Sequence, residues 1–512
     1  MSKRNLLRIV VVVGALAVFA YTRFENHAQR QPKAELAAPI PAGAKAFTLG
    51  RLHFTACQLP QKSSGATTSA FCAPFSVPEN RADPKSRTLK LRLALIKSSA
   101  ITADSDIVVY LAGGPGQSAV DTWPQMAAAL APLRKHHHIL LLDQRGTGES
   151  HPLTCKRDEE GENEDKFDLD ALRKHVGKCL AEVERYADPR FYTTTDATRD
   201  LEDVRQALGA PQFDLVGVSY GTRMAQQYAM HYPRSVRSIV LDSVAPNQLV
   251  LGEDFAENLH DALEAQFKLC EDTPACAKAF GDPYASLIKL RDQLRAHPEN
   301  FSFPDPVTFE VKQIHLNEYS LIGLVRLFAY SPETAALLPL SIDEGLKGNY
   351  TPLAGQSKLL EGDLSDLQEN GMQMSVICSE DADLLKPRPQ DADLLLGTTI
   401  IRALEAECEI WPHGTRPADF HAPLKTDTPV LILEGQLDPV TPPRYGREVL
   451  KGLSNGRLLV APGMGHNVIG RGCIPKLVGE FVDKLDPKTL DAKCVDQLGP
   501  IPAFTDFNGA AP

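Results

Sequence analysis

The sequence lacks an apolar run long enough to cross a membrane. Its uncharged N-terminal stretch, residues 9–20, is shorter than the span of about 20 residues that a bilayer requires. Three basic residues precede this stretch, an order typical of a secretory signal. We therefore expect a signal peptide over residues 1–20, a loose leader over residues 21–46, and an exported protein in the periplasm or the extracellular medium. No stable membrane association is expected after signal cleavage; an uncleaved anchor is the alternative.

Positive charge is also in short supply, with 54 Lys and Arg against 65 Asp and Glu and a formal net charge of -11. Nucleic acid is therefore not an expected partner, because its binding relies on clustered basic residues. The sequence has neither the tight Cys and His spacing of a zinc site nor the Gly-Lys-Ser/Thr ending of a phosphate-binding loop. We expect no metal and no cofactor.

The acidic residues are concentrated in the middle of the chain. Residues 246–424 contain 29 acidic and 13 basic side chains, so their net charge is 13 minus 29, or -16. Such a stretch attracts cations, including the α-ammonium group of a peptide. A solvated acidic surface is the alternative explanation.

Ten cysteines in an exported chain favour disulfides, because the compartments outside the cytosol are oxidising. The sequence alone does not fix the connectivity. Short loops close most easily, so the spacing favours neighbours. The pairs are Cys57 with Cys72, Cys155 with Cys179, Cys270 with Cys276, Cys378 with Cys408, and Cys473 with Cys494.

Short β-branched runs alternate with helical patterns, which predicts an α/β fold with a mostly parallel sheet. The runs cover residues 107–111, 139–142, 213–218, 238–241, 430–433 and 457–460. Helices are expected over residues 196–208 and 442–453, the second capped by Thr441. The alternation stops between the fourth and fifth runs. We therefore expect a sheet domain over residues 47–245 and 425–512, with a large, mainly helical cap inserted over residues 246–424.

Ser219 is the expected nucleophile. It lies in the pattern Gly-x-Ser-x-Gly, with Gly217 and Gly221 around it, directly after one of the predicted strands and before a helix expected to begin near Arg223. This is the nucleophile elbow of the α/β-hydrolase fold, whose turn is too tight for side chains at the two glycine positions. The pattern alone is common, and its place between strand and helix makes it specific.

A serine hydroxyl needs a base to take its proton, and that base needs a carboxylate to orient it. In this fold the chain order is serine, acid, histidine. Asp438 and His466 each follow one of the last two predicted strands, where the catalytic groups of open α/β sheets gather. They are the expected acid and base. Asp242, which also ends a strand, is the rival acid, although a structural role suits its earlier position better.

The negative oxygen of the transition state needs two backbone N–H donors. The first is expected from Tyr220, directly after the nucleophile, and the second from the glycine-rich turn after the run at 107–111. Gly114 is favoured as the second donor and Gly113 is next. A plain tight turn is the alternative role for these glycines.

Taken together, these residues resemble the secreted prolyl and tripeptidyl aminopeptidases of the α/β-hydrolase class, the TAP-like serine peptidases. The matching segments are AGGPGQS at 112–118, DQRGTGES at 143–150, GVSYGT at 217–222, VLDSV at 240–244, SVICSED at 375–381, EGQLDP at 434–439 and APGMGHN at 461–467. Prolyl aminopeptidases usually have His and Trp where this chain has Ala112 and Tyr220. The match is therefore closer to the tripeptidyl branch.

The resemblance implies an aminopeptidase that releases residues from the free N-terminus of small peptides under a helical cap. It supports the same triad and the same oxyanion donors, Gly114 and Tyr220. It also draws attention to Glu380 and Asp381 as ligands of the substrate α-ammonium group, with a solvated acidic pair as the alternative. Asp143 and Arg145 are expected to form an internal ion pair beside the site. Two other functions stay open: an esterase that acts on small esters, and a non-catalytic protein that kept the fold.

Overall fold

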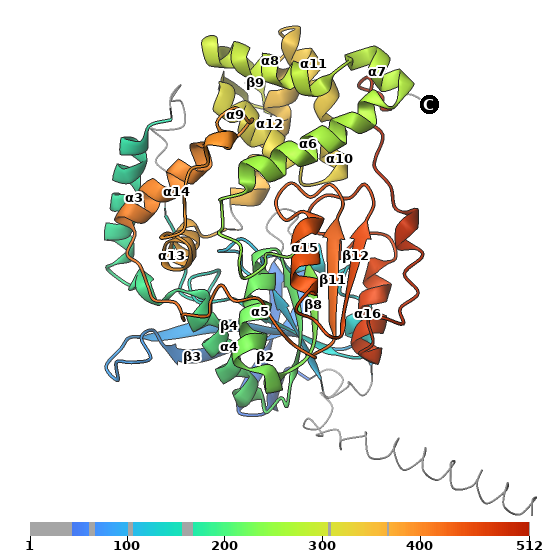
Figure 1. Ribbon diagram of the computed structural model, residues 1–512. Helices are drawn as coiled ribbons and strands as arrows, with labels where there is room; N and C mark the ends of the chain where they lie inside the picture. Colours follow the sequence, from blue (N-terminus) through green and yellow to red (C-terminus); the bar gives the residue numbers. More distant parts are fainter. Residues whose placement is uncertain are drawn as a thin grey trace, which may run out of the picture.

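The computed structural model describes residues 44–60, 67–100, 106–155, 167–305, 309–365 and 368–510. The predicted signal peptide and most of the predicted leader lie outside these residues. Figure 1 shows a twisted sheet with helices packed around it and a helical region above one end of the sheet. Within the described ranges, no helix is both long enough and apolar enough to span a bilayer.

A single ten-stranded sheet forms the centre of the molecule, in the order β1-β2-β3-β4-β6-β5-β7-β8-β11-β12. The strands are β1 Ala46–Leu49, β2 Leu52–Pro60, β3 Thr67–Pro78, β4 Thr88–Ile96, β5 Ile107–Leu111, β6 His138–Leu142, β7 Phe213–Val218, β8 Val236–Asp242, β11 Val430–Gly435 and β12 Gly456–Ala461. From β6 to β12 neighbouring strands are parallel, and from β1 to β6 they are antiparallel. The parallel part contains the six predicted strands.

Alternate residues of the parallel strands face two apolar cores. Val109 of β5 and Leu215 of β7 point to a core that also contains residues of helices α4 (Thr194–Leu208), α5 (Tyr220–His231) and α15 (Pro443–Leu450). Val108 and Val216 point to the opposite core, beside helix α16 (Ile474–Lys484). Strands covered on both faces are apolar throughout, which explains why their sequences are continuous β-branched and leucine-rich runs.

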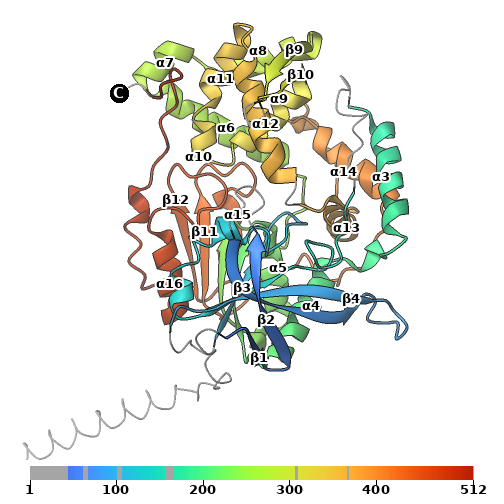
Figure 2. The same cartoon turned by 180° about the vertical axis from the view of Figure 1, so that it is seen from behind.

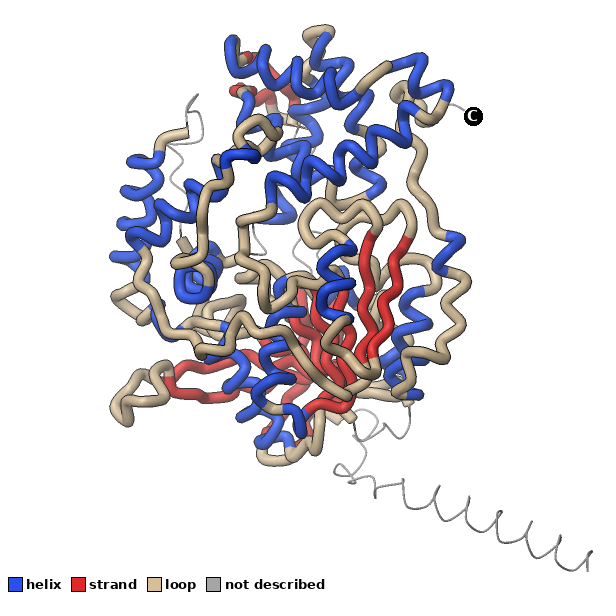
Figure 3. The backbone as a smooth tube through the Cα atoms, viewed as in Figure 1, coloured by secondary structure: helices blue, strands red, loops and turns tan. Residues whose placement is uncertain are grey.

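The region above the sheet is mainly helical, as predicted (Figures 2 and 3). Its helices are α6 Phe255–Glu271, α7 Pro274–Phe280, α8 Pro283–Ala296, α9 Glu318–Phe328, α10 Pro332–Ala335, α11 Leu338–Leu346, α12 Thr351–Ser365, α13 Asn370–Glu380 and α14 Thr399–Ile410. A hairpin that was not predicted, β9 Glu299–Pro304 and β10 Val311–Leu316, lies among them.

This region divides into two packing units. Buried residues of α6, α8, α9 and α11 form an apolar core of their own. Those of α13 and α14 join the core of the sheet domain instead. The last two helices are therefore packed as part of the hydrolase core, although they come from the inserted stretch.

All ten cysteines form disulfides, and the five bonds join the pairs that the spacing favours. Their Cα atoms are 5.0 to 6.3 Å apart, within the normal range for such bonds. Two of them, Cys270–Cys276 and Cys378–Cys408, lie in the helical region.

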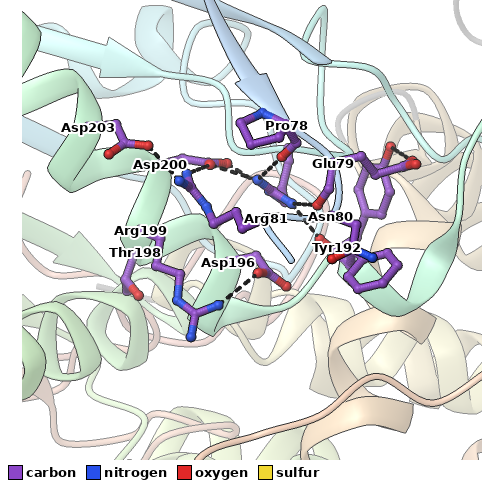
Figure 4. A network of polar contacts seen from close by, with 12 residues as sticks. Pro78, Glu79, Asn80, Arg81, Tyr192, Asp196, Thr198, Arg199, Asp200 and Asp203 are labelled. Carbon is purple, nitrogen blue, oxygen red and sulfur yellow. Dashed lines mark hydrogen bonds and ion pairs between the residues drawn. The ribbon is translucent and has the colours of Figure 1, made fainter. Parts of the chain in front are cut away.

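The predicted ion pair between Asp143 and Arg145 is wrong. Arg145 instead forms two hydrogen bonds of 2.7 Å with the carboxylate of Asp200 on α4. Asp200 also pairs with Arg81 (Figure 4). Asp143 accepts hydrogen bonds from the Ser118 hydroxyl at 2.6 Å and from the backbone of the same turn. Both side chains have structural roles, but each has its own partners.

Candidate active site

The nucleophile elbow has the expected geometry. Ser219 links the end of β7 to the start of α5 with φ 55° and ψ -124°, a strained conformation for a residue with a side chain. A Cβ atom placed on Gly221 would lie 2.1 Å from the carbonyl oxygen of Leu111, and one on Gly217 would lie 2.5 Å from that of Gly221. Only glycine fits at these two positions. Ser219 is partly exposed, whereas its neighbours Val218 and Tyr220 are buried.

Asp438 and His466 form a buried acid–base pair. The His466 Nδ1 atom lies 2.7 Å from Asp438 Oδ2, and the backbone N–H groups of Val440 and Thr441 donate to Oδ1 at 2.8 Å each. The Thr441 hydroxyl donates to Oδ2 at 3.0 Å. These donors hold the carboxylate in one orientation, and the carboxylate leaves the other ring nitrogen, Nε2, to accept a proton.

The electrostatic surroundings of His466 favour its protonated form. Burial lowers the pKa of His466. The charge of Asp438 and the hydrogen bond to it raise the pKa by more than burial lowers it, so the net shift is upward. A base whose imidazolium form is stabilised in this way suits proton transfer from a weakly acidic hydroxyl.

Asp242 connects Ser219 to the histidine loop, residues 462–473, which lies between β12 and α16 and contains His466. Its backbone oxygen accepts the N–H of Ser219 at 2.9 Å. Its side chain accepts the N–H groups of Val468 and Ile469 at 2.9 and 3.0 Å. Burial raises its pKa to about 6. This residue therefore has the structural role that the sequence favoured for it, and it brings Ser219 and His466 to the same edge of the sheet.

Among the described residues, the Ser219 hydroxyl makes no hydrogen bond to His466. Nucleophile–base contacts are often long in the absence of substrate and shorten in the complex. The structure therefore supplies the acid–base pair and the elbow, and it places both at the carboxyl ends of strands β7, β11 and β12.

The glycine-rich turn lies against the nucleophile. A Cβ atom on Gly113 would be 3.1 Å from the Cβ atom of Ser219. Gly114 and Gly116 have φ angles of 106° and 110°, which side-chain-bearing residues rarely adopt. The turn brings the backbone of Gly113 and Gly114 near the elbow, so both stay candidates for the second oxyanion donor beside Tyr220.

Glu380 and Asp381 are fully buried at the end of α13. Glu380 accepts hydrogen bonds from the backbone N–H and the hydroxyl of Thr194, at 2.6 and 3.0 Å. Asp381 pairs with Arg223 of the nucleophile helix at 2.9 Å. The alternative of a solvated acidic pair is therefore wrong. Both carboxylates have internal partners, and α-ammonium binding by them stays a prediction.

Two residues beside the triad were missed as site residues. Thr441 was expected to cap a helix, but Pro442 takes that position and the Thr441 side chain contacts Asp438 and His466. Tyr330, from the helical region, accepts the backbone N–H of His466 at 2.8 Å. No motif surrounds Tyr330. Every residue has a backbone carbonyl oxygen, so the residue type at position 330 does not indicate this contact.

In the part of the chain that the structure describes, no group of three or more His, Cys, Asp or Glu side chains is arranged to hold a metal ion.

Two protein families match the chain, and the matches contain the site. Residues 106–269, which include Ser219, match the alpha/beta hydrolase fold family. Residues 393–494, which include Asp438 and His466, match the family described as TAP-like protein.

Three similar proteins cover most of the chain. The YuaR protein of Escherichia coli is 26% identical over 415 residues, covering 76% of this chain and 80% of its own. The serine protease Hip1 of Mycobacterium tuberculosis is 23% identical, covering 96% of this chain and 99% of its own. The tripeptidyl aminopeptidase of Streptomyces coelicolor is 24% identical, covering 84% of each chain. The chain thus has the α/β-hydrolase fold and a C-terminal region that matches the TAP-like family, and over most of its length it is similar to a serine protease and to a tripeptidyl aminopeptidase.

Proposed function

We propose that the chain is an exported serine hydrolase, and more narrowly an aminopeptidase that releases residues from the free N-terminus of small peptides. The observation that carries the proposal is the buried pair of Asp438 and His466, 2.7 Å apart, at the same sheet edge as the strained Ser219 elbow. Asp242 binds the backbone on both sides of this arrangement.

The proposed reaction forms and then hydrolyses an acyl-enzyme. The Ser219 oxygen attacks the scissile carbonyl carbon while His466 Nε2 takes the hydroxyl proton, and the backbone N–H groups of Tyr220 and Gly114 stabilise the resulting oxyanion. His466 then donates the proton to the leaving amine as the C–N bond breaks. A water molecule, deprotonated by His466, attacks the ester carbonyl carbon, and His466 returns that proton to the Ser219 oxygen as the ester C–O bond breaks and the acyl group leaves as a carboxylic acid. Asp438 orients the imidazole throughout and stabilises its charged form.

Peptide substrates and export rest on different observations. The similarity to Hip1 and to the tripeptidyl aminopeptidase, whose names describe peptidases, supports a peptide substrate. The five disulfides support an oxidising compartment outside the cytosol. The acidic charge of residues 246–424 supports the attraction of a cationic N-terminus.

The proposal is tested first by labelling with a fluorophosphonate, which reacts with activated serines. We expect labelling of the wild type, none of Ser219→Ala, and normal labelling of Ser454→Ala, an exposed serine between β11 and β12. A folded wild-type protein that is not labelled would point to the non-catalytic alternative.

The second test separates a peptidase from an esterase. Defined peptides with free and with acetylated N-termini are digested, and the products are identified by mass spectrometry. An aminopeptidase loses most of its activity on acetylation, because the α-ammonium group is gone. Equal cleavage of both, or cleavage of small esters only, would contradict aminopeptidase activity and favour the esterase.

A further inference from the structure

The helical region meets His466 at one corner, residues 329–336, which comprise the link after α9, the short helix α10 and the residue after it. The carbonyl oxygen of Tyr330 accepts the backbone N–H of His466 at 2.8 Å. A Cβ atom on Gly465 would lie 2.2 Å from this oxygen, so only glycine allows the approach. The main chain before His466 is thus fitted closely to the main chain of Tyr330.

The side chains of the same two residues are also in contact. The rings of Tyr330 and His466 have centroids 5.2 Å apart and planes at 73°, the edge-to-face arrangement that aromatic pairs prefer. The bond from Nδ1 to Asp438 fixes one atom of the imidazole. The Thr441 hydroxyl lies 3.3 Å from the same atom, and contacts to one atom leave the ring free to tilt about it. The Tyr330 ring restricts this tilt.

The corner itself is held from three other directions. Glu333 pairs with Arg471 of the histidine loop, with Oε2 and Nη2 at 3.0 Å. The Gln266 side chain of α6 donates to the Ala329 oxygen at 3.2 Å. The N–H of Phe504, in the C-terminal tail, donates to the Ala336 oxygen at 2.9 Å. Because these anchors come from the cap, the histidine loop and the tail, the corner is a fixed support.

We propose that Tyr330 is a positioning residue of the catalytic reaction: it holds the His466 imidazole in the orientation that directs Nε2 toward Ser219. The inference rests on the proposed function and deepens it. It makes the cap part of the catalytic apparatus at this corner, since movement of residues 329–336 away from the sheet would remove one of the supports of the base.

The test compares Tyr330→Leu and Tyr330→Met with the conservative Tyr330→Phe. Tyr350→Leu is the matched control, because Tyr350 is another cap tyrosine in contact with an aromatic ring, that of Phe301 at 6.0 Å. For each folded variant, kcat and KM are measured on a peptide substrate, and the rate of fluorophosphonate labelling is measured against pH. Thermal unfolding reports stability separately, and Tyr330→Met keeps most of the apolar volume if Tyr330→Leu does not fold.

We expect Tyr330→Leu and Tyr330→Met to lower kcat roughly 10- to 100-fold with little change in KM, the size of effect that a misplaced catalytic group produces. Their labelling profiles should shift along the pH axis, because His466 is held differently. Tyr330→Phe should recover most of kcat, and Tyr350→Leu should leave kcat unchanged. Three results would overturn the inference. They are an unchanged kcat in Tyr330→Met, a change in KM of the Tyr330 variants without a change in kcat, and a fall in kcat of Tyr350→Leu equal to that of the Tyr330 variants.

These outcomes are distinct from a failure of the proposed function. If the wild type is not labelled, or if Ser219→Ala is still labelled, the serine hydrolase itself is contradicted. If labelling depends on Ser219 and the Tyr330 variants react like the wild type, only the positioning role is lost.

Discussion

Two of the contacts between the inserted region and the sheet domain are built differently. At residues 329–336 the contact to His466 consists of a main-chain hydrogen bond and a pair of rings. At the end of α13 it consists of the buried acids Glu380 and Asp381, which face Thr194 and Arg223 of the sheet domain. The first contact is made by backbone groups and a pair of rings, whereas the second is made by ionisable side chains and depends on which of them are protonated.

The α13 contact brings two acids, Glu380 and Asp381, to one arginine, and His421 Nε2 lies 3.5 Å from Asp381 Oδ1. Arg223 lies 2.9 Å from Asp381 and 3.9 Å from Glu380, and all three side chains are fully buried. Burial raises the pKa of Glu380 to about 8, although Arg223 acts to lower it. At neutral pH Glu380 is then mostly protonated and Asp381 is the partner of Arg223. Thr194 extends the contact to the hydroxyl of Tyr220, at 2.6 Å, and so to the residue proposed as an oxyanion donor.

The largest effect is expected from Asp381→Ala. It leaves the guanidinium of Arg223 buried without its carboxylate, and removal of one partner of a buried ion pair costs about 3–5 kcal/mol of unfolding free energy. Asp383→Ala is the matched control, because Asp383 lies two residues away, is 62% exposed and pairs with Arg416. It should cost at most about 1 kcal/mol. Denaturant unfolding measures both losses of unfolding free energy. Equal losses would mean that the buried pair of Asp381 with Arg223 contributes no more to stability than an exposed ion pair.

A second prediction concerns the pH dependence of Glu380→Gln. A carboxyl group with a raised pKa in the folded state contributes stability that is present below about pH 4.5 and is lost as pH rises toward 8. The wild type should therefore lose stability relative to Glu380→Gln over this interval, at up to about 1.4 kcal/mol per pH unit. Unfolding curves at several pH values give this difference. Parallel curves would mean that Glu380 is ionised in the folded protein.

The same variant bears on substrate recognition. If Glu380 binds the α-ammonium group of the substrate, Glu380→Gln should raise KM for free N-terminal peptides and leave the fluorophosphonate labelling rate unchanged. An unchanged KM would restrict Glu380 to the structural contact with Thr194.

The smallest effect is expected from Glu333→Gln at the other contact. The ion pair with Arg471 is half exposed on the Glu333 side, so its loss should cost at most about 1 kcal/mol, and less at high salt. Because the main-chain bond to His466 remains, kcat should stay close to that of the wild type. A large fall in kcat would show that this corner also relies on charge.

The parallel half of the fold could be predicted because strands that are buried on both faces have continuous apolar sequences. Strands β1 to β4 were not predicted: they are not continuous apolar runs like the parallel strands, and Pro74 lies inside β3, where a proline argues against a central strand. The three residues proposed as the triad could be located in the sequence because each follows a strand of the sheet. Ser219, Asp438 and His466 stay predictions as a catalytic set until activity is measured.

Long-range partners could not be predicted from local patterns. Arg145 was assigned to the acid two residues away, but it pairs with Asp200 on a helix 55 positions along the chain. Glu380 and Asp381 follow a cysteine at the end of a helix and give no local sign of burial. Whether such charges face solvent is decided by the segments that pack against them, here α4 and α5.

Asp242 gives the site a mechanical property that its individual contacts do not. One residue at the end of β8 binds both the amide of the nucleophile and the amides that follow the base. When the sheet bends or twists in thermal motion, serine and histidine are displaced together with their common anchor. Their separation is then less sensitive to deformation of the sheet than it would be if each were fastened to a strand of its own.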